Sequence, residues 1–355
     1  MSIVMTAPEP VRQVQTSDRS SQAFERLAGP YRRELKLHCY RMLGSLHEAE
    51  DAVQDAYLRA WRGFAGFEEY GSFRAWLYRI ATNVCLNAIA SRKAARRVLP
   101  DQEAPATSPV QVPDGPPPTD VAWLEPYPDS NLEGIADDAP NPEVRYAARE
   151  AVQLAFVAAI QVLPPRQRVA ILLCDVLGWA ASETATLLGG STASVNSALQ
   201  RGRETLAKRY PDGRPQAAIA RPSATERKLL DGYLRAWEGH DLDGFVALLK
   251  EDATYTMPPW RQWFVGRAAI GTFFGLAWQT CGGLRLVPTA ANGQPAFAVY
   301  EQSSADQQWH AHSIHVLAIE RDAIARLTAF VPPVGPRLFE AFGLSLILDP
   351  SARQA

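Results

Sequence analysis

Short hydroxyl and amide side chains stand beside arginines between residues 191 and 203. Hydroxyl and amide groups can exchange hydrogen bonds with the edges of DNA bases, and guanidinium groups can contact the phosphates of the DNA backbone. The combination therefore points to contacts with duplex DNA. The candidate residues are Ser191, Thr192, Ala193, Ser194, Asn196, Ser197, Gln200, Arg201 and Arg203.

A sharp corner between two short helices would position these side chains. Gly189 suits the tight turn, and Ala185, four positions earlier, is small enough to let the two helix axes approach. Val195 and Ala198, six and nine positions after the glycine, would seat the second helix on the first. The spacing predicts a helix-turn-helix whose outward face lies in a major groove; the alternative is an ordinary helical hairpin.

A second group of basic and amide residues follows a predicted helix from Phe73 to Arg97, which Ser72 can cap. Its polar side carries Arg79, Asn83 and Asn87 and ends in a basic cluster, which can follow a phosphate backbone. Cations at the carboxyl end also suit the helix dipole, so this sign is weaker than the corner.

Two further helices precede this one. Apolar residues at steps of three and four predict a helix that starts near Phe24 and stops at Gly44. The next predicted helix, 47–64, carries an acidic, polar flank. That flank is a candidate protein-docking surface, formed by Asp51, Gln54, Asp55 and Arg59.

Charge is strongly segregated along the chain. Residues 1–100 hold 15 basic and 10 acidic residues, residues 101–144 hold 10 acidic and no basic ones, and residues 145–221 hold 10 basic and 5 acidic ones. This pattern predicts two modules that face nucleic acid, joined by an acidic linker rich in proline. Within the linker, Trp123, Leu124 and Tyr127 either dock into a groove of another domain or partner, or form an incidental apolar spot.

Both basic segments resemble known modules. "LPPRQRVAILLCDVLGWAASETATLLGGSTASVNSALQRGRETL" resembles region 4 of the extracytoplasmic-function group of sigma-70 factors, and "EAEDAVQDAYLRAWRGF" with "GSFRAWLYRIATNVCLNAIASRKAARR" resembles region 2 of that family. The resemblance implies a factor that recruits core RNA polymerase to promoters and helps to open them. The competing interpretation is a helix-turn-helix regulator that acts without joining the polymerase.

The resemblance also implies roles for residues. The acidic flank would dock on the clamp helices of the largest polymerase subunit, and the corner helix would read the minus 35 element. Asn196 and Ser197 stand where the family commonly has a basic residue, so we expect minus 35 binding that is weak or favours an unusual sequence. The melted minus 10 strand would contact Phe64, Phe67, Arg79, Asn83, Asn87, Arg92, Lys93, Arg96 and Arg97. The linker would thread past the active centre and the RNA exit path.

Helical patterns followed by strand patterns fill the last third of the chain and predict an α+β roll. "AWEGHDLDGFVALLKEDATYTMPPW" and "GRAAIGTFF" are similar to SnoaL-like members of the nuclear transport factor 2 superfamily, which wrap a curved sheet around a conical pocket. Candidate tail-pocket residues are Tyr255, Trp263, Trp278, Tyr300, His310, His312 and Phe330, with His315 on the opposite strand face from His310 and His312.

Three roles stay open for this tail: catalysis, ligand sensing, or a regulatory brace for the two helical modules. No acid–base pair at a telling spacing is visible, so we expect no enzymatic activity and no cofactor. A small ligand or an anti-sigma protein are the additional partners left open.

The predicted fold is therefore multidomain: two all-α modules and a cone-shaped α+β roll. The expected division is a flexible start 1–20, region 2 at 21–99, linker 100–144, region 4 at 145–212, linker 213–223, SnoaL-like domain 224–346 and tail 347–355.

Composition indicates which broad class of protein this is. An apolar content of 47% with a charged content of 21% is typical of a globular protein. No apolar run could span a membrane and no signal peptide is visible, so we expect a cytoplasmic protein. Cys39, Cys85, Cys174 and Cys281 lie too far apart in the sequence for a CxxC pair, which argues against a zinc site.

Overall fold

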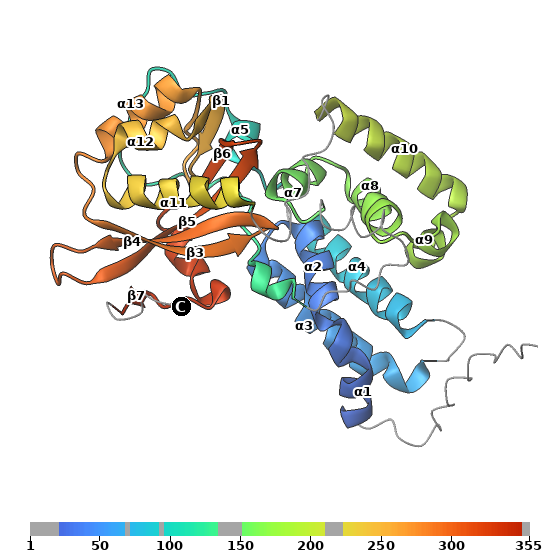
Figure 1. The fold of residues 1–355 in the computed structure, drawn as a ribbon. Coiled ribbons are helices and arrows are strands. Elements are labelled where there is room, and N and C mark those ends of the chain that lie inside the picture. Colours follow the sequence, from blue (N-terminus) through green and yellow to red (C-terminus); the bar gives the residue numbers. More distant parts are fainter. Residues whose placement is uncertain (1–20, 68–71, 92–95, 134–150, 210–222, 350–355) are drawn as a thin grey trace, which may run out of the picture.

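The computed structural model describes residues 21–67, 72–91, 96–133, 151–209 and 223–349. A helical body and a sheet domain lie side by side, and the C-terminal third of the chain forms the sheet domain (Figure 1). Among the described residues, no helix is both long and apolar enough to cross a bilayer. The predicted fold class, helical modules followed by an α+β domain, is confirmed.

The first helical module comprises α1 (Ser21–Ala28), α2 (Arg32–Leu43), α3 (Leu46–Gly63) and α4 (Phe73–Ser91). A 3-10 turn at Gly29–Tyr31 interrupts the single helix predicted from Phe24, because Pro30 cannot continue the hydrogen-bond ladder. Gly44 ends α2 in the left-handed conformation, as expected. Ser45 then caps α3 by accepting a hydrogen bond from the Glu48 N–H.

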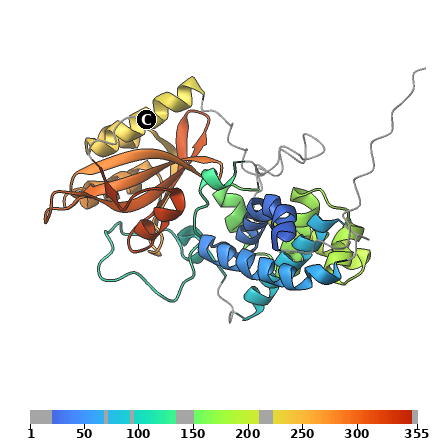
Figure 2. The same ribbon diagram turned by 90° about the horizontal axis from the view of Figure 1, so that it is seen from below.

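The connecting segment, residues 96–133, packs against its neighbours over much of its length. After the short helix α5 (Pro100–Glu103) it runs along the sheet domain as the extended teal loop in Figure 2. Thr107 pairs its N–H with the Trp263 carbonyl at 2.8 Å. Two of its carboxylates meet basic residues of the sheet domain, in the pairs Asp101–Arg326 (2.8 Å) and Asp120–Arg261 (2.7 Å).

The second helical module comprises α7 (Leu154–Ile160), α8 (Pro165–Ala170), α9 (Ala181–Leu188) and α10 (Thr192–Arg209). A π-helical turn at Ile171–Val176 follows α8 directly. The corner predicted around Gly189 is confirmed: Gly189 has φ of 62°, and Ala185, Val195 and Ala198 are buried. This buried contact fixes the angle at which α10 leaves the body.

The strands of the sheet domain are β1 (Leu249–Thr256), β2 (Trp263–Val265), β3 (Leu284–Ala291), β4 (Gln294–Gln302), β5 (Trp309–Glu320), β6 (Ala323–Phe330) and β7 (Ile347–Leu348). They form one seven-stranded sheet in the order β2-β1-β6-β5-β4-β3, with β7 beside β5. Only the β1–β6 pairing is parallel among those described. The helices α11 (Ala224–Glu238), α12 (Leu242–Ala247) and α13 (Arg267–Ala277) cover one face, and α14 (Val334–Leu338) packs on β5 and β6.

The turn between β3 and β4 joins all four parts of the chain. Asn292 and Gly293 both have positive φ, which the two-residue turn of a twisted hairpin requires. The fully buried Asn292 amide accepts from the Tyr127 N–H (2.8 Å) and donates to Tyr40 Oη (2.9 Å) and to the Val152 carbonyl (2.8 Å). The hairpin thereby contacts the connecting segment and both helical modules. We call these four residues the Asn292 clasp.

Replacing Asn292 by glycine tests the clasp. Glycine keeps the positive φ but leaves buried donors and acceptors without partners, so we expect the free energy of unfolding to fall by about 2–4 kcal/mol. Urea unfolding measures the loss, and hydrogen exchange should show faster exchange at Tyr127. Gln307→Gly is the matched control, because Gln307 also has positive φ but lies exposed in a loop. Equal effects of the two variants would contradict the role of the amide.

Candidate polymerase and nucleic-acid interfaces

The outer face of α10 presents the side chains predicted to read duplex DNA. Val195, Ala198 and Leu199 point into the body, and the side chains between them are open to solvent. All nine candidates are exposed: Ser191, Thr192, Ala193, Ser194, Asn196, Ser197, Gln200, Arg201 and Arg203. The Ser191 hydroxyl accepts from the Ser194 N–H (3.2 Å) and so orders the start of the helix.

The α4 helix presents a second polar face. Arg79, Asn83 and Asn87 are all exposed, one helical turn apart. Phe64, which the sequence offered as a base-stacking ring, is 8% exposed, and its ring lies 5.4 Å from that of Phe24. Phe64 therefore supports the module core. Phe67 is only partly buried, so it retains surface on which a base could stack.

The basic residues after α4 have different environments. Arg96 is exposed. Arg97, predicted to contact DNA, pairs in this structure with Glu48 (2.9 Å) and donates to the Trp123 carbonyl (2.7 Å). These contacts join the Arg97 guanidinium to α3 and to the connecting segment. Arg92 and Lys93 lie outside the described residues.

The predicted docking of the Trp123–Tyr127 island is confirmed. Trp123, Leu124 and Tyr127 are all buried, and Leu124 lies against the Gly44 turn. The Glu125 carboxylate accepts from the Leu46 N–H (2.7 Å) and the Ser45 hydroxyl (3.0 Å), so a negative charge sits at the start of α3, where the helix dipole favours it.

The polar flank of α3 is open to solvent. Asp51, Gln54 and Arg59 are exposed, and Asp55 forms an ion pair with Arg59 at 2.8 Å. Leu58 lies among them and is 56% exposed, although it is a large apolar residue on a polar face. Sequence reasoning did not single out Leu58, because a lone exposed apolar residue on a polar face is common and by itself indicates no function.

The two helical modules pack against each other through a buried polar contact. Arg168 is 6% exposed, and its guanidinium donates to the Gln161 side chain (2.6 Å) and to the Met42 carbonyl. The Gln161 amide donates to the Arg41 carbonyl at 2.9 Å. Burial lowers the pKa of Arg168 to about 10, which leaves it charged at neutral pH. Nearby, the rings of Tyr78 and Trp179 lie 5.3 Å apart.

The predicted tail-pocket residues do not line one pocket. Tyr255 and Trp278 pack between the helices and the sheet, whereas Tyr300 and Phe330 belong to the core on the other face. Trp263 donates its indole N–H to the Ala104 carbonyl of the connecting segment at 2.7 Å. The candidates divide between the two faces because inner and outer residues alternate along a strand.

The structure groups the histidines of β5 differently from the prediction, which placed His310 and His312 on one strand face and His315 on the other. A shift in register between Val299 and Tyr300 marks a β-bulge at His312. The bulge lets Ser313 link His312 and His315 by hydrogen bonds. Ser313 Oγ lies 3.1 Å from His312 Nδ1 and 3.0 Å from His315 Nε2. His310 remains apart and contacts Asp306. Among the described residues, no group of three or more His, Cys, Asp or Glu is arranged to hold a metal ion.

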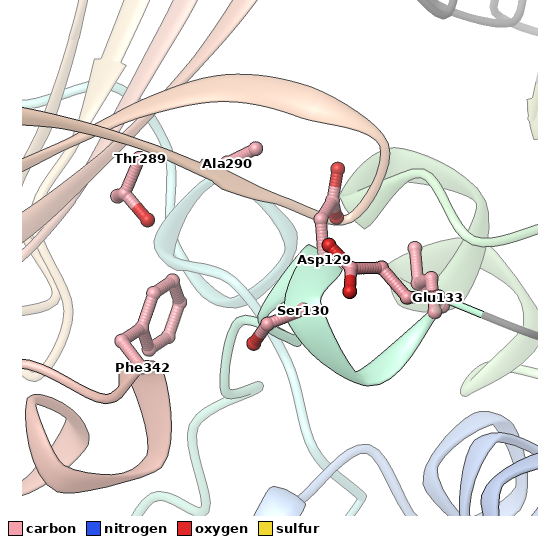
Figure 3. A pocket seen from close by; sticks show the side chains of 7 residues that line it. Asp129, Ser130, Glu133, Thr289, Ala290 and Phe342 are labelled. Carbon is pink, nitrogen blue, oxygen red and sulfur yellow. The ribbon is translucent and has the colours of Figure 1, made fainter. Parts of the chain in front are cut away.

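A cavity of about 450 Å³ lies between the connecting segment, β3 and the C-terminal turn (Figure 3). None of the seven predicted tail-pocket residues lines it. Burial raises the pKa of Asp129 to about 6, and its carboxylate accepts from the Gly293 N–H at 2.8 Å. The lining residues are Asp129, Ser130, Leu132, Glu133, Thr289, Ala290 and Phe342.

Comparison with known proteins agrees with this architecture. The Sigma-70 region 2 model matches residues 27–96, the Sigma-70 region 4 model matches 153–206, and the SnoaL-like domain model matches 230–327. The ECF RNA polymerase sigma factor SigG of Mycobacterium tuberculosis H37Rv is 42% identical over 341 residues, 92% of this chain and 85% of its own. SigW of Bacillus subtilis is 30% identical over 202 residues, 57% of this chain and 95% of its own.

A solved structure shares the fold over nearly the whole length. The crystal structure of the extracytoplasmic-function sigma factor SigJ of Mycobacterium tuberculosis superposes with a TM-score of 0.58 at 20% identity, covering 92% of this chain and all of that one. The class defined by these matches is the sigma-70 proteins, which carry core RNA polymerase to promoters. Within it, this chain belongs to the extracytoplasmic-function sigma factors, in the form that carries a C-terminal SnoaL-like domain.

Buried histidines predict how stability depends on pH. Burial lowers the pKa of His38 and of His315 to about 3, below the ordinary 6.5. The unfolded chain therefore takes up protons first as the pH falls below 6.5, and each histidine should cost about 1.4 kcal/mol of unfolding free energy per pH unit down to about 3.

His315→Gln should reduce this slope in the sheet domain. The ring of Trp237 lies 4.5 Å from that of His315, so tryptophan fluorescence reports unfolding there. Urea unfolding at pH 7.5, 6.5, 5.5 and 4.5 measures the slope, and the exposed His47→Gln is the control. A slope equal to that of the unmodified protein would show that His315 titrates normally.

Proposed function

We propose that three exposed surfaces divide the work of this sigma factor. The α3 flank docks on core polymerase, the α4 face holds the melted minus 10 strand, and the α10 face reads the minus 35 duplex. The exposure of all nine α10 candidates, on a helix seated by Val195 and Ala198, supports the third assignment most directly. The predicted domain limits, 21–99, 145–212 and 224–346, are proposed with these roles, as is action in the cytoplasm, where core polymerase works.

The α3 surface combines charge with one apolar contact. Asp51 and Gln54 supply exposed polar groups, and Leu58 supplies apolar area at the centre. Burial of such a side chain in a rim of polar residues gives an interface both affinity and orientation. The Asp55–Arg59 ion pair fixes the neighbouring side chains before contact.

Two substitutions on α3, one of a charged and one of an apolar residue, test the docking surface. Asp51→Lys and Leu58→Glu should each weaken binding to core polymerase by about tenfold or more, since each removes a complementary contact and introduces an unfavourable one. Binding of the full chain to core enzyme is measured by anisotropy. Asp231→Lys, an exposed site on α11, is the control. Unchanged affinity in both α3 variants would contradict the assignment.

We propose further that the described arrangement is a closed state. Minus 35 and minus 10 elements lie about 25 base pairs apart, or about 85 Å at 3.4 Å per base pair. Here α10 packs on α8 and α9, and these pack on α4. Helix axes in contact lie about 8–10 Å apart, so α10 lies about 20 Å from α4. One promoter cannot meet both faces at once until the modules separate.

The SnoaL-like domain acts as the brace of this closed state. The Asn292 clasp and the Asp101–Arg326 and Asp120–Arg261 pairs hold the connecting segment on the sheet domain. On the other side of the sheet, aromatic rings such as Tyr233, Trp237 and Phe274 pack against one another between the helices and the strands. This packing supports a structural role for the domain in preference to catalysis.

Energy transfer between dyes tests the opening. Azide-bearing residues at positions 91 and 208, at the ends of α4 and α10, carry the donor and the acceptor. We expect efficient transfer in the free chain and a marked loss when core polymerase is added, because the modules separate. A pair at positions 62 and 91, both in the first module, should not change. Constant transfer between 91 and 208 on core binding would falsify the closed-state proposal.

A further inference from the structure

Arg203 lies on the outer face of α10, and Asp175 contacts its guanidinium from the side of the protein body. Its Nε donates to Asp175 Oδ2 at 3.0 Å and its Nη2 donates to Oδ1 at 2.5 Å, which is a two-point contact. The Arg203 side chain is 58% exposed, whereas the Asp175 side chain is only 11% exposed. The carboxylate is therefore sheltered, and the guanidinium extends from it toward solvent.

Two local features bring this pair together. Asp175 lies in the π-helical turn Ile171–Val176, a rare widening of a helix that often occurs at functional positions. Gly202, next to Arg203, lets α10 approach this turn closely, since a Cβ there would lie 3.0 Å from Ile171 Cγ1. The backbone of α10 is thus seated directly on the segment that carries the carboxylate.

The pair leaves donors available on the DNA side. Asn196, Gln200 and Arg203 follow one another at steps of four and three, so they share a helix face. The contact with Asp175 uses Nε and one Nη2 hydrogen. Both hydrogens of Nη1 can still donate to a phosphate oxygen at the carboxyl-terminal end of this face.

We propose that Asp175 is a positioning residue for DNA recognition: it fixes the Arg203 guanidinium so that Nη1 meets one phosphate of the minus 35 duplex. A planar guanidinium clamped at two points loses little freedom on binding, so the contact is formed in advance. The proposal rests on the assignment of α10 to the minus 35 element.

The alternative is that Asp175 merely neutralises Arg203. The two roles predict opposite changes in DNA binding when the Asp175 carboxylate is removed. Asp175→Asn makes the module more positive by one charge and would strengthen DNA binding if neutralisation were its role. If positioning is its role, the same variant weakens binding despite the added positive charge.

The test uses holoenzyme assembled from core polymerase and the full chain. The probe is a promoter duplex enriched from a randomised pool by the unmodified holoenzyme, with single phosphates of its upstream half replaced in turn by uncharged methylphosphonates. We expect one replacement to weaken the unmodified holoenzyme by about three- to tenfold. Arg203→Met should bind unmodified DNA more weakly and show no further loss at that phosphate.

Asp175→Asn should resemble Arg203→Met at that phosphate, and Asp175→Glu should restore part of the effect. Arg203→Lys should also lose the position-specific effect, because lysine keeps the charge but cannot be clamped at two points. This variant tests the same idea if Asp175→Asn does not fold. Glu183→Gln is the control for charge, since Glu183 lies at the start of α9 and contacts the Ala180 N–H.

Three outcomes would overturn the proposal. Tighter DNA binding by Asp175→Asn would show that Asp175 neutralises Arg203. A methylphosphonate profile of Asp175→Asn or Arg203→Lys equal to that of the unmodified holoenzyme would show that orientation of the guanidinium is not needed. If Arg203→Met alters no phosphate at all, α10 does not contact the minus 35 backbone through this residue, and the underlying assignment fails instead.

Discussion

In the proposed closed form, the buried Asn292 amide joins three other parts of the chain through hydrogen bonds. Asn292 sits in a hairpin turn where both residues have positive φ, and its side chain satisfies polar groups from the first module, the connecting segment and the second module. Because these groups are removed from water, any separation of the parts must offer each of them another partner. Opening is therefore a concerted event in which several desolvated contacts are exchanged together.

Polar and ionic contacts cross the same junctions beside apolar ones, such as the ring contacts Tyr40–Tyr127 at 4.7 Å and Tyr78–Trp179 at 5.3 Å. Arg168 and Gln161 bind main-chain carbonyls of the first module, and Asp101 and Asp120 pair with arginines of the sheet domain. The exposed Asp120–Arg261 pair contributes little net free energy. The buried Arg168 and Gln161 side chains fix the geometry more strongly, because their polar groups must keep partners when water is excluded. To open the proposed closed form, core polymerase must offer these buried groups other partners.

Sequence patterns revealed the features that depend on local rules. The corner at Gly189 follows from one backbone conformation and two buried side chains, and the burial of the Trp123–Tyr127 island follows from apolar residues in an acidic segment. The bulge at His312 and the π-helical turn at Asp175 add residues that alter strand or helix spacing, so periodicity alone placed the histidines wrongly and gave no sign of the Asp175–Arg203 contact. The Arg97 contacts with Glu48 and Glu125 gave no sign in the sequence either, because both carboxylates are distant from Arg97 along the chain.

The proposed closed form does not cover the faces that we propose to read DNA. The α10 candidates and the Arg79, Asn83 and Asn87 row on α4 remain exposed while α4 packs on α8 and α9. Occluding those faces would require the sheet domain to match two nucleic-acid surfaces, whereas fixing the distance between them requires only one rigid junction. A single event, the separation of two modules, then makes both faces usable on one promoter. In the proposed closed form the distance between the two faces is therefore controlled, and each face itself stays exposed.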